Sequence, residues 1–347
     1  RDSINTIPLF NIIYADSEDN ILYHFGGNVP KKKGDWSRWQ NVVATSSSSD
    51  IWDSYYDHTS VPSYINPEGD WIQNANDPPF TSTVPSTVRP EDFPGHIAPN
   101  SMSFRPQRSA TLIKNAEPMT LESFIELKHD TKAQMAIRLK DDFAKLLSMT
   151  DDETTIKALT LLSEWDGSFD SDSRGAVLFA NIIMANRGND IFKEQWDFDH
   201  PLSTPDGFKA PEKVLGLIKA VATELESKIG SIDVPYGEVF RVKVGEYEYP
   251  GNGGFGQFGI FRTMNYSPGR DGKYYAFHGD SFVCTTEFGE SIRAKAVMGY
   301  GNATQPGNKH VGDQLKLYRD KQLRDVWLSR KDHEANLEGI EKLEDMQ

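Results

Sequence analysis

Three apolar stripes at helical spacing occupy the middle of the chain, and strand-like segments flank them on both sides. The apolar residues within 131–149 recur every three or four positions, as one face of a helix requires: Met135, Leu139, Phe143 and Leu146. Residues 211–229 repeat this spacing behind Pro211, which suits a first helical turn because its missing N–H has no role there. The order of strands, helices, strands and helices predicts an α+β fold.

We predict four consecutive regions from this pattern. Residues 1–118 form a strand- and loop-rich part, 119–235 a mainly helical region, 236–312 a second strand region, and 313–347 C-terminal helices. Within the first region, two apolar segments over 11–27 are joined by four polar residues, which is typical of a β-hairpin.

Two helix starts carry capping signals. Thr150 and Glu153 predict a capping box ahead of an apolar helix. Ser329 and Asp332 predict a cap on a C-terminal helix that carries three apolar residues: Leu337, Ile340 and Leu343.

Composition excludes several classes of function. The formal charge of -14 argues against nucleic acid as a partner, because phosphate binding requires lysine and arginine. The single cysteine, Cys284, allows no disulfide within the chain and no zinc site of the CxxC type. No apolar run approaches the roughly 18 residues that a membrane-spanning helix needs.

Two motifs suggest ligand sites but fit other interpretations better. "GNGGFG" (251–256) matches the glycine pattern of dinucleotide-binding loops, yet Pro250 precedes it and strand-like residues follow it. We interpret it as a glycine-rich turn that permits close approach of the backbone. "DGSFDSDSRG" (166–175) lacks the spacing of a calcium loop, so a helix-capping loop is favoured; structural calcium elsewhere stays open.

The stretch "WIQNANDPPF" (71–80) holds two asparagines on a stiff support. Pro78 and Pro79 fix their own φ and push the preceding residues toward extended conformations. In an extended chain, Asn74 and Asn76 point to the same side. Their carboxamides either satisfy the local backbone as Asx-turns or are donors held rigid for an oxyanion.

Six segments in order give the chain a resemblance to the penicillin acylase family of N-terminal-nucleophile hydrolases, in the C-terminal part of the β subunit. "WIQNANDPP" resembles the family segment that supplies an oxyanion asparagine, and "FRPQRSATLI" (104–113) resembles the arginine segment that follows it. The other matching segments are "NIIYADSEDNILYHFGGNVPKKKGDW" (11–36), "LLSEWDG" (161–167), "GDSF" (279–282), and "KHVGDQLKLY" (309–318) with "VWLSRKDHEAN" (326–336).

The resemblance implies part of a four-layer αββα sandwich and hydrolysis of an N-acyl amide bond. An N-terminal serine attacks in such enzymes, with its own α-amino group as the base. The matching oxyanion residue is Asn76, and the matching active-site arginine is Arg105, with Arg108 as the alternative. Arg105 would position the asparagine and the amine, or form a plain structural ion pair. Asn74 and Trp71 are assigned to substrate binding, and Asn74 also supports Asn76.

The chain begins Arg1-Asp2-Ser3, without a terminal nucleophile. We therefore expect the nucleophile on absent polypeptide: the α subunit and the N-terminal part of the β subunit of the same precursor. The expected substrate is a penicillin- or cephalosporin-like amide or an N-acyl homoserine lactone, with no cofactor required for catalysis. The resemblance implies a periplasmic or secreted protein. The alternative is a secreted, non-enzymatic binding module with an acylase-like fold.

Overall fold

A computed structural model describes residues 10–186, 191–337 and 339–340. Its N-terminal sheet is antiparallel with the order β1-β2-β3, formed by β1 (Phe10–Ala15), β2 (Ile21–Gly26) and β3 (Ser63–Ile65). The β1–β2 pair confirms the predicted hairpin. Apart from the short helix α1 (Trp36–Trp39) and 3-10 turns, residues 27–103 are mostly irregular loops.

The second strand region contains a mixed sheet with the order β7-β6-β9-β8. Its strands are β6 (Phe240–Val244), β7 (Tyr247–Pro250), β8 (Met264–Pro268) and β9 (Tyr274–Gly279). Beside it lies an antiparallel sheet of β10 (Phe282–Glu287), β11 (Arg293–Met298) and β12 (Arg324–Asp325). A two-stranded ladder of β4 (Phe192–Glu194) and β5 (Asp206–Phe208) completes the strands of the described residues.

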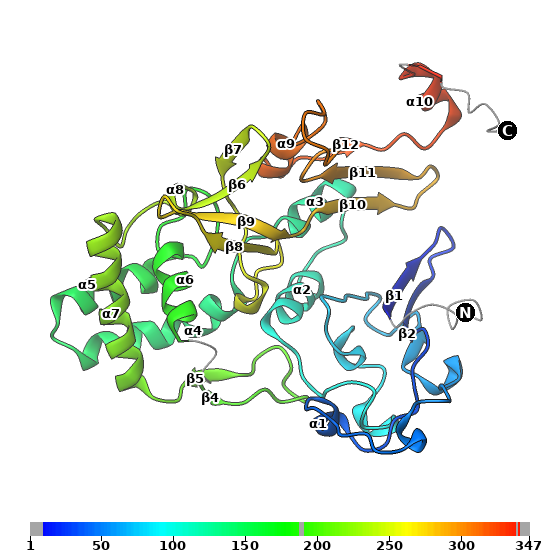
Figure 1. The fold of residues 1–347 in the computed structure, drawn as a ribbon, viewed down its shortest axis with the longest axis horizontal. Helices are drawn as coiled ribbons and strands as arrows, with labels where there is room; N and C mark the ends of the chain where they lie inside the picture. Colours follow the sequence, from blue (N-terminus) through cyan, green and yellow to red (C-terminus); the bar gives the residue numbers. More distant parts are fainter. Residues whose placement is uncertain (1–9, 187–190, 338, 341–347) are drawn as a thin grey trace.

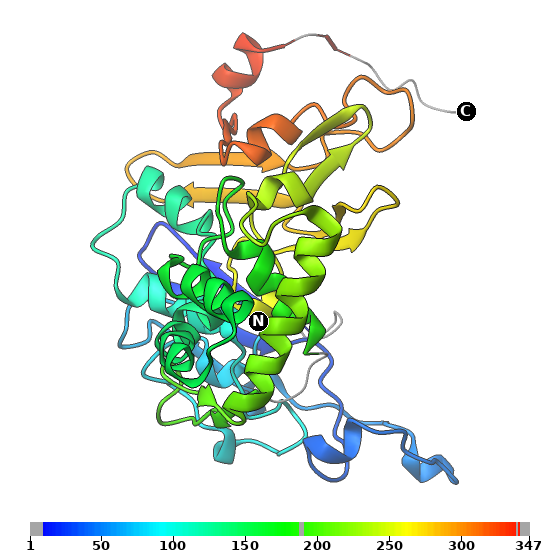
Figure 2. The same cartoon turned by 90° about the vertical axis from the view of Figure 1, so that its left-hand side faces the viewer.

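Helices α4 to α7 form the side of the molecule opposite the β1–β2 hairpin (Figure 1). They are α4 (Gln134–Leu146), α5 (Glu153–Glu164), α6 (Ala176–Ala185) and α7 (Pro211–Ile229). The other helices are α2 (Phe104–Lys114), α3 (Leu121–Lys128), α8 (Tyr236–Val239), α9 (Leu315–Arg319) and α10 (Arg330–Ala335). Seen from the side of α7, the loops of residues 40–56 project from the body of the molecule (Figure 2).

The apolar stripes that define α4 and α7 face the main core. All four stripe residues of α4 are buried, and Pro211 occupies the first turn of α7, as predicted. Rings from distant parts of the chain meet in this core, with Phe169, Phe179 and Phe258 all fully buried. A smaller core under the N-terminal sheet includes Tyr23 and Phe25 of β2. Within the described residues, no helix is long and apolar enough to cross a membrane.

The predicted cap of α5 is wrong. The cap of α5 is Asp152, whose side chain accepts from the Thr155 N–H, because the helix starts two residues later than Thr150 would require. The predicted strand- and loop-rich region 1–118 also contains α2.

The C-terminal region is less helical than its pattern suggests. Ser329 and Asp332 do form a reciprocal capping box at the start of α10. However, α10 ends at Ala335, so Leu337 and Ile340 lie beyond the helix, and Leu343 lies outside the described residues. The four-region division itself stays a prediction.

Candidate active site

Asn76 lies at the tip of a tight turn and has a left-handed backbone, with φ of 63°. Few residues other than glycine adopt this conformation at low cost, and asparagine is one of them. The prediction that Asn74 and Asn76 point to one side of an extended chain is therefore wrong. Side-chain hydrogen bonds bend the chain at Asn76, which does not directly precede a proline, whereas Pro78 keeps the extended conformation expected before Pro79.

Asn74 is occupied by the backbone of its own turn. Its Oδ1 accepts from the Asn76 N–H at 3.0 Å, and its Nδ2 donates to the Asp77 carbonyl at 3.1 Å. These bonds form an Asx-turn, which was one of the two alternatives for the pair of asparagines. Asn74 thus supports the turn that exposes Asn76.

Asp77 anchors the turn from beneath and is 4% exposed. Its Oδ1 accepts from the Ala75 N–H at 2.8 Å, and its Oδ2 accepts from Gln73 Nε2 at 3.0 Å and from Thr81 Oγ1 at 3.1 Å. Burial raises the pKa of this carboxyl to about 6, although the three hydrogen bonds act in the opposite direction.

Arg105, in the first turn of α2, contacts the exposed Asn76 side chain. Its Nη2 donates to Asn76 Oδ1 at 2.9 Å. Because a guanidinium only donates, this contact fixes which end of the carboxamide is oxygen and turns Nδ2 away from Arg105. No hydrogen bond within the described residues occupies Asn76 Nδ2, so it remains available to an acceptor.

The surroundings of Arg105 differ from those of Arg108. Burial lowers the pKa of Arg105, while the negative charges of Asp280 and Asp77 partly counter this effect. Arg108, by contrast, forms a two-pronged ion pair with Asp130, with contacts of 2.8 and 2.7 Å. Arg108 is therefore committed to a structural pair, and Arg105 is the arginine that lies beside Asn76.

Asn76 borders a pocket of about 380 Å³. Its walls come from the end of β2, from residues 29–36, from the turn itself and from residues 96–99. They are largely apolar, and the polar lining residues are Lys32, Asn76, Asp77 and His96. The apolar wall residues are Phe25, Val29, Pro30, Trp36, Pro78, Ile97, Ala98 and Pro99. Such a lining suits an apolar group of a ligand.

The structure does not bring every candidate residue to this pocket. Trp71 is half-buried and is not among the residues that line it. Sequence reasoning missed Trp36 and His96. Trp36 belongs to the "GDW" of a matching segment, so a signal for it was present, whereas His96 lies in a loop without a distinctive pattern.

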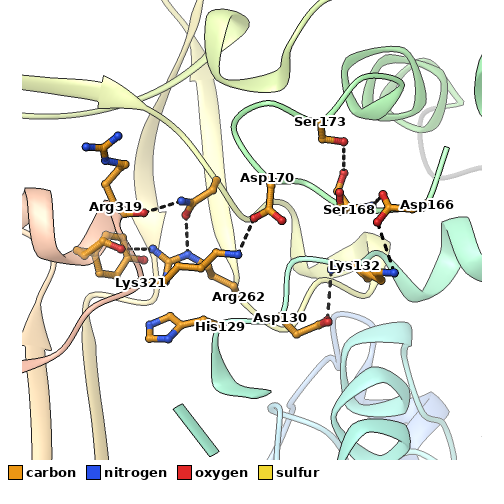
Figure 3. A network of polar contacts seen from close by, with 12 residues as sticks. His129, Asp130, Lys132, Asp166, Ser168, Asp170, Ser173, Arg262, Arg319 and Lys321 are labelled. Atoms are coloured by element: carbon orange, nitrogen blue, oxygen red, sulfur yellow. Dashed lines mark hydrogen bonds and ion pairs between the residues drawn. The ribbon is translucent and has the colours of Figure 1, made fainter. Parts of the chain in front are cut away.

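Two of the three carboxylates in the acidic loop 166–173 pair with lysines (Figure 3). Asp166 lies 3.4 Å from Lys132 Nζ, and Asp170 accepts from Lys321 Nζ at 2.6 Å. Gly175, the last residue of the predicted capping loop, is the N-cap of α6, although no side chain of the loop bonds to the helix there. Within the described residues, no group of three or more metal-ligating side chains is arranged to hold an ion. Structural calcium stays an untested prediction.

The turn thus places an arginine-oriented carboxamide beside a largely apolar pocket in an α+β fold. A family profile described as penicillin amidase matches residues 2–335. The chain belongs to the penicillin amidase family. The predicted α+β fold of the N-terminal-nucleophile hydrolases is confirmed, because the chain superimposes on a solved penicillin G acylase.

That structure is a thermostable penicillin G acylase from Alcaligenes faecalis. The match has a TM-score of 0.60 and 16% sequence identity, and covers 99% of this chain and 69% of that one. Among curated relatives, an acyl-homoserine lactone acylase PvdQ from Pseudomonas fluorescens (strain Pf0-1) is 24% identical, over 93% of this chain and 45% of the relative. The aculeacin-A acylase of Actinoplanes utahensis is 23% identical, over 91% and 45%. The chain thus spans less than half the length of these relatives.

Proposed function

We propose that this chain supplies the oxyanion donor of an acylase that hydrolyses N-acyl amides. The observation that carries the proposal is the contact of 2.9 Å between Arg105 Nη2 and Asn76 Oδ1, which leaves Nδ2 free beside an apolar pocket. When a nucleophile adds to the acyl carbonyl carbon, negative charge develops on its oxygen. Asn76 Nδ2–H donates to that oxygen, and stabilises the transition state more than the ground state.

Arg105 acts on the reaction through Asn76. Its donation to Oδ1 polarises the carboxamide and strengthens Nδ2–H as a donor, because linked hydrogen bonds reinforce one another. The left-handed turn adds rigidity, since the Asn76 N–H already donates to Asn74 Oδ1. A donor that is fixed before the substrate arrives needs no reorganisation during the reaction.

The attacking group in this proposal is an N-terminal serine on polypeptide outside this chain. The short span of the chain relative to its curated relatives supports this part. The exposed aromatic residues of two edge strands support a large docking surface: Phe10 is 58% exposed on β1, and Phe282 is 58% exposed on β10. Both strands lie on the side of the molecule away from α5 and α7 (Figure 1). The remainder of the precursor would cover them.

The substrate class follows from the pocket and the relatives. An apolar wall next to the donor favours an apolar acyl chain, as in an N-acyl homoserine lactone, over a polar side chain. A penicillin- or cephalosporin-like amide is the second candidate, supported by the structural relative. A periplasmic or secreted location is part of the same proposal and rests on the family.

The test replaces Asn76 in the complete, processed enzyme. Asn76→Gly keeps the left-handed turn but lacks the donor, so kcat with N-hexanoyl homoserine lactone and with phenylacetyl-p-nitroanilide should fall about 10²- to 10³-fold. KM should change little. An unchanged kcat with both substrates would remove Asn76 from the mechanism.

A matched control separates the donor from the backbone strain. Asp19, at φ of 60° in the exposed β1–β2 turn, shares the conformation of Asn76 but lies outside the pocket. Asn76→Ala and Asp19→Ala should both strain a left-handed backbone, by about 1 kcal/mol. Only Asn76→Ala should lower kcat.

The location of the nucleophile is tested separately. Residues 1–347 expressed alone should not hydrolyse either substrate, and robust turnover would contradict this part of the proposal. An acylase piece should also co-purify with a polypeptide whose N-terminal residue is serine, cysteine or threonine. A non-enzymatic binding module would have no such companion.

A further inference from the structure

The glycine-rich segment Gly251–Gly256 has a role that neither the fold family nor the proposed chemistry explains. It leads into a 3-10 helix, η7 (Gly256–Phe258), and not into the α-helix that a dinucleotide loop requires. This short helix packs against the first turn of α2, where Arg105 lies. The segment is therefore placed to affect the arginine that orients Asn76.

Two glycines allow this close packing. A methyl group on Gly256 would lie 3.1 Å from Arg105 Nε and 3.3 Å from its Cδ. A methyl group on Gly259 would lie 2.7 Å from the Cβ of Phe104, the residue before Arg105. The bare backbone at Gly256 and Gly259 thus forms one wall beside the start of α2.

The wall is rigid because its aromatic residues are held in the main core. Phe258 is fully buried, and its ring centroid lies 5.8 Å from that of Phe179 and 5.1 Å from that of Phe255. The carbonyl of Gly259 also accepts from the Gln134 N–H at 3.3 Å, which ties the segment to α4. A side chain that presses on this wall must itself move, since the wall has little freedom to do so.

We propose that Gly256 is a positioning residue for hydrolysis, because its missing side chain lets the Arg105 side chain lie where Nη2 meets Asn76 Oδ1. The inference rests on the proposed function, in which Arg105 orients the oxyanion donor. The backbone at Gly256 does not have the positive φ that would itself require glycine, in contrast to Gly259 at φ of 85°. The closeness of Arg105 is what distinguishes this position.

Because the backbone tolerates alanine there, Gly256→Ala in the complete, processed enzyme is a clean test. Its methyl group displaces the Arg105 side chain by a few tenths of an ångström. Misplacement by 1 Å can cost about 10²-fold in rate, so we expect a kcat about tenfold lower with N-hexanoyl homoserine lactone. KM should stay within about twofold and the thermal midpoint should not fall, because alanine also restricts the unfolded chain.

A double-mutant cycle decides whether Gly256 acts through Arg105. Arg105→Ala should lower kcat by itself, and adding Gly256→Ala to it should cause no further loss, since no guanidinium remains to be displaced. Gly216→Ala, in α7 with nothing within 4 Å of the added methyl group, is the matched control and should leave kcat unchanged.

The outcomes separate this inference from the proposed function. If Arg105→Ala and Asn76→Gly lower kcat while Gly256→Ala does not, the inference is wrong and the proposed function stands. If Gly256→Ala lowers kcat equally in the presence and absence of Arg105, it acts by another route and the inference is also wrong. Loss of folded protein on Gly256→Ala would contradict it too, because the glycine would then serve the fold. If none of the three changes affects kcat, the proposed function fails as well.

Discussion

The buried carboxyl of Asp77 should make the folded protein less stable as pH rises, which is the reverse of the usual effect of a carboxyl group. Three hydrogen-bond donors surround it and favour the carboxylate, but its burial favours the neutral acid and prevails, with a pKa of about 6 against an ordinary 3.8. The folded protein therefore binds a proton on Asp77 in a pH range where the unfolded chain does not.

The size and sign of the effect follow from linkage. Between pH 3.8 and 6, the native state holds more protons at this site than the unfolded state, so the free energy of unfolding decreases as pH rises through this window. At about 1.4 kcal/mol per pH unit, the full effect is about 3 kcal/mol and is reached above pH 7. The carboxylate is thus a cost to stability at neutral pH that the protonated acid does not impose.

Asp77→Asn removes the titration while keeping the shape of the side chain. In the variant an NH₂ group replaces one carboxyl oxygen, so either the Ala75 N–H or the Gln73 and Thr81 donors lose their acceptor. This loss should lower the free energy of unfolding by about 1–3 kcal/mol at every pH. Between pH 4 and pH 7.5, the free energy of unfolding of the variant should therefore rise by about 2.5 kcal/mol relative to that of wild type.

The assay is urea unfolding followed by tryptophan fluorescence, with both proteins measured at half-unit steps of pH. Taking the difference in the free energy of unfolding between the two proteins cancels the contribution of the other carboxyl groups. A difference that stays constant with pH, or that moves in favour of wild type as pH rises, would mean that the three hydrogen bonds outweigh burial and would refute the reasoning.

Two further predictions concern the fold. Arg108→Ala should destabilise the protein by about 3 kcal/mol in urea unfolding, because it leaves the mostly buried Asp130 without its ion-pair partner. The folded variant should keep its kcat. A loss of kcat would favour Arg108 over Arg105 as the site arginine. Burial, with the nearby charges of Arg262 and Lys128, lowers the pKa of His129 to about 3, so the free energy of unfolding should decrease as pH falls below 6.5. His129→Gln should flatten this acid limb, and an identical limb in both proteins would contradict the assignment.

The candidate site shows what sequence reasoning can and cannot predict. The two alternatives for the asparagine pair, a backbone-satisfying turn and a rigid donor, divide between the two residues: Asn74 takes the first and Asn76 is available for the second. The left-handed turn was missed because it depends on Asp77, whose three hydrogen bonds come from residues on both sides of it. Local preferences before proline do not include such contacts.

Helices whose apolar residues recur over several turns were predictable from the sequence, and short elements were not. The stripe of α4 and the proline start of α7 need only residues within the helix to specify them. By contrast, α10 ends at Ala335 although apolar residues continue, because no core in the described residues receives them: Leu337 is 57% and Ile340 is 75% exposed. Periodicity predicts a helix only where a partner surface exists.

The open β1 strand has a practical consequence for anyone producing this chain. Among the described residues, no strand pairs with the outer edge of β1, which carries Phe10, Ile13 and Tyr14 in water. Such an edge is a template on which a second molecule can add its own strand. Material synthesised without a covering polypeptide should therefore aggregate as its concentration rises. Co-expression with the rest of the precursor, or lysine in place of Ile13, should keep it in solution.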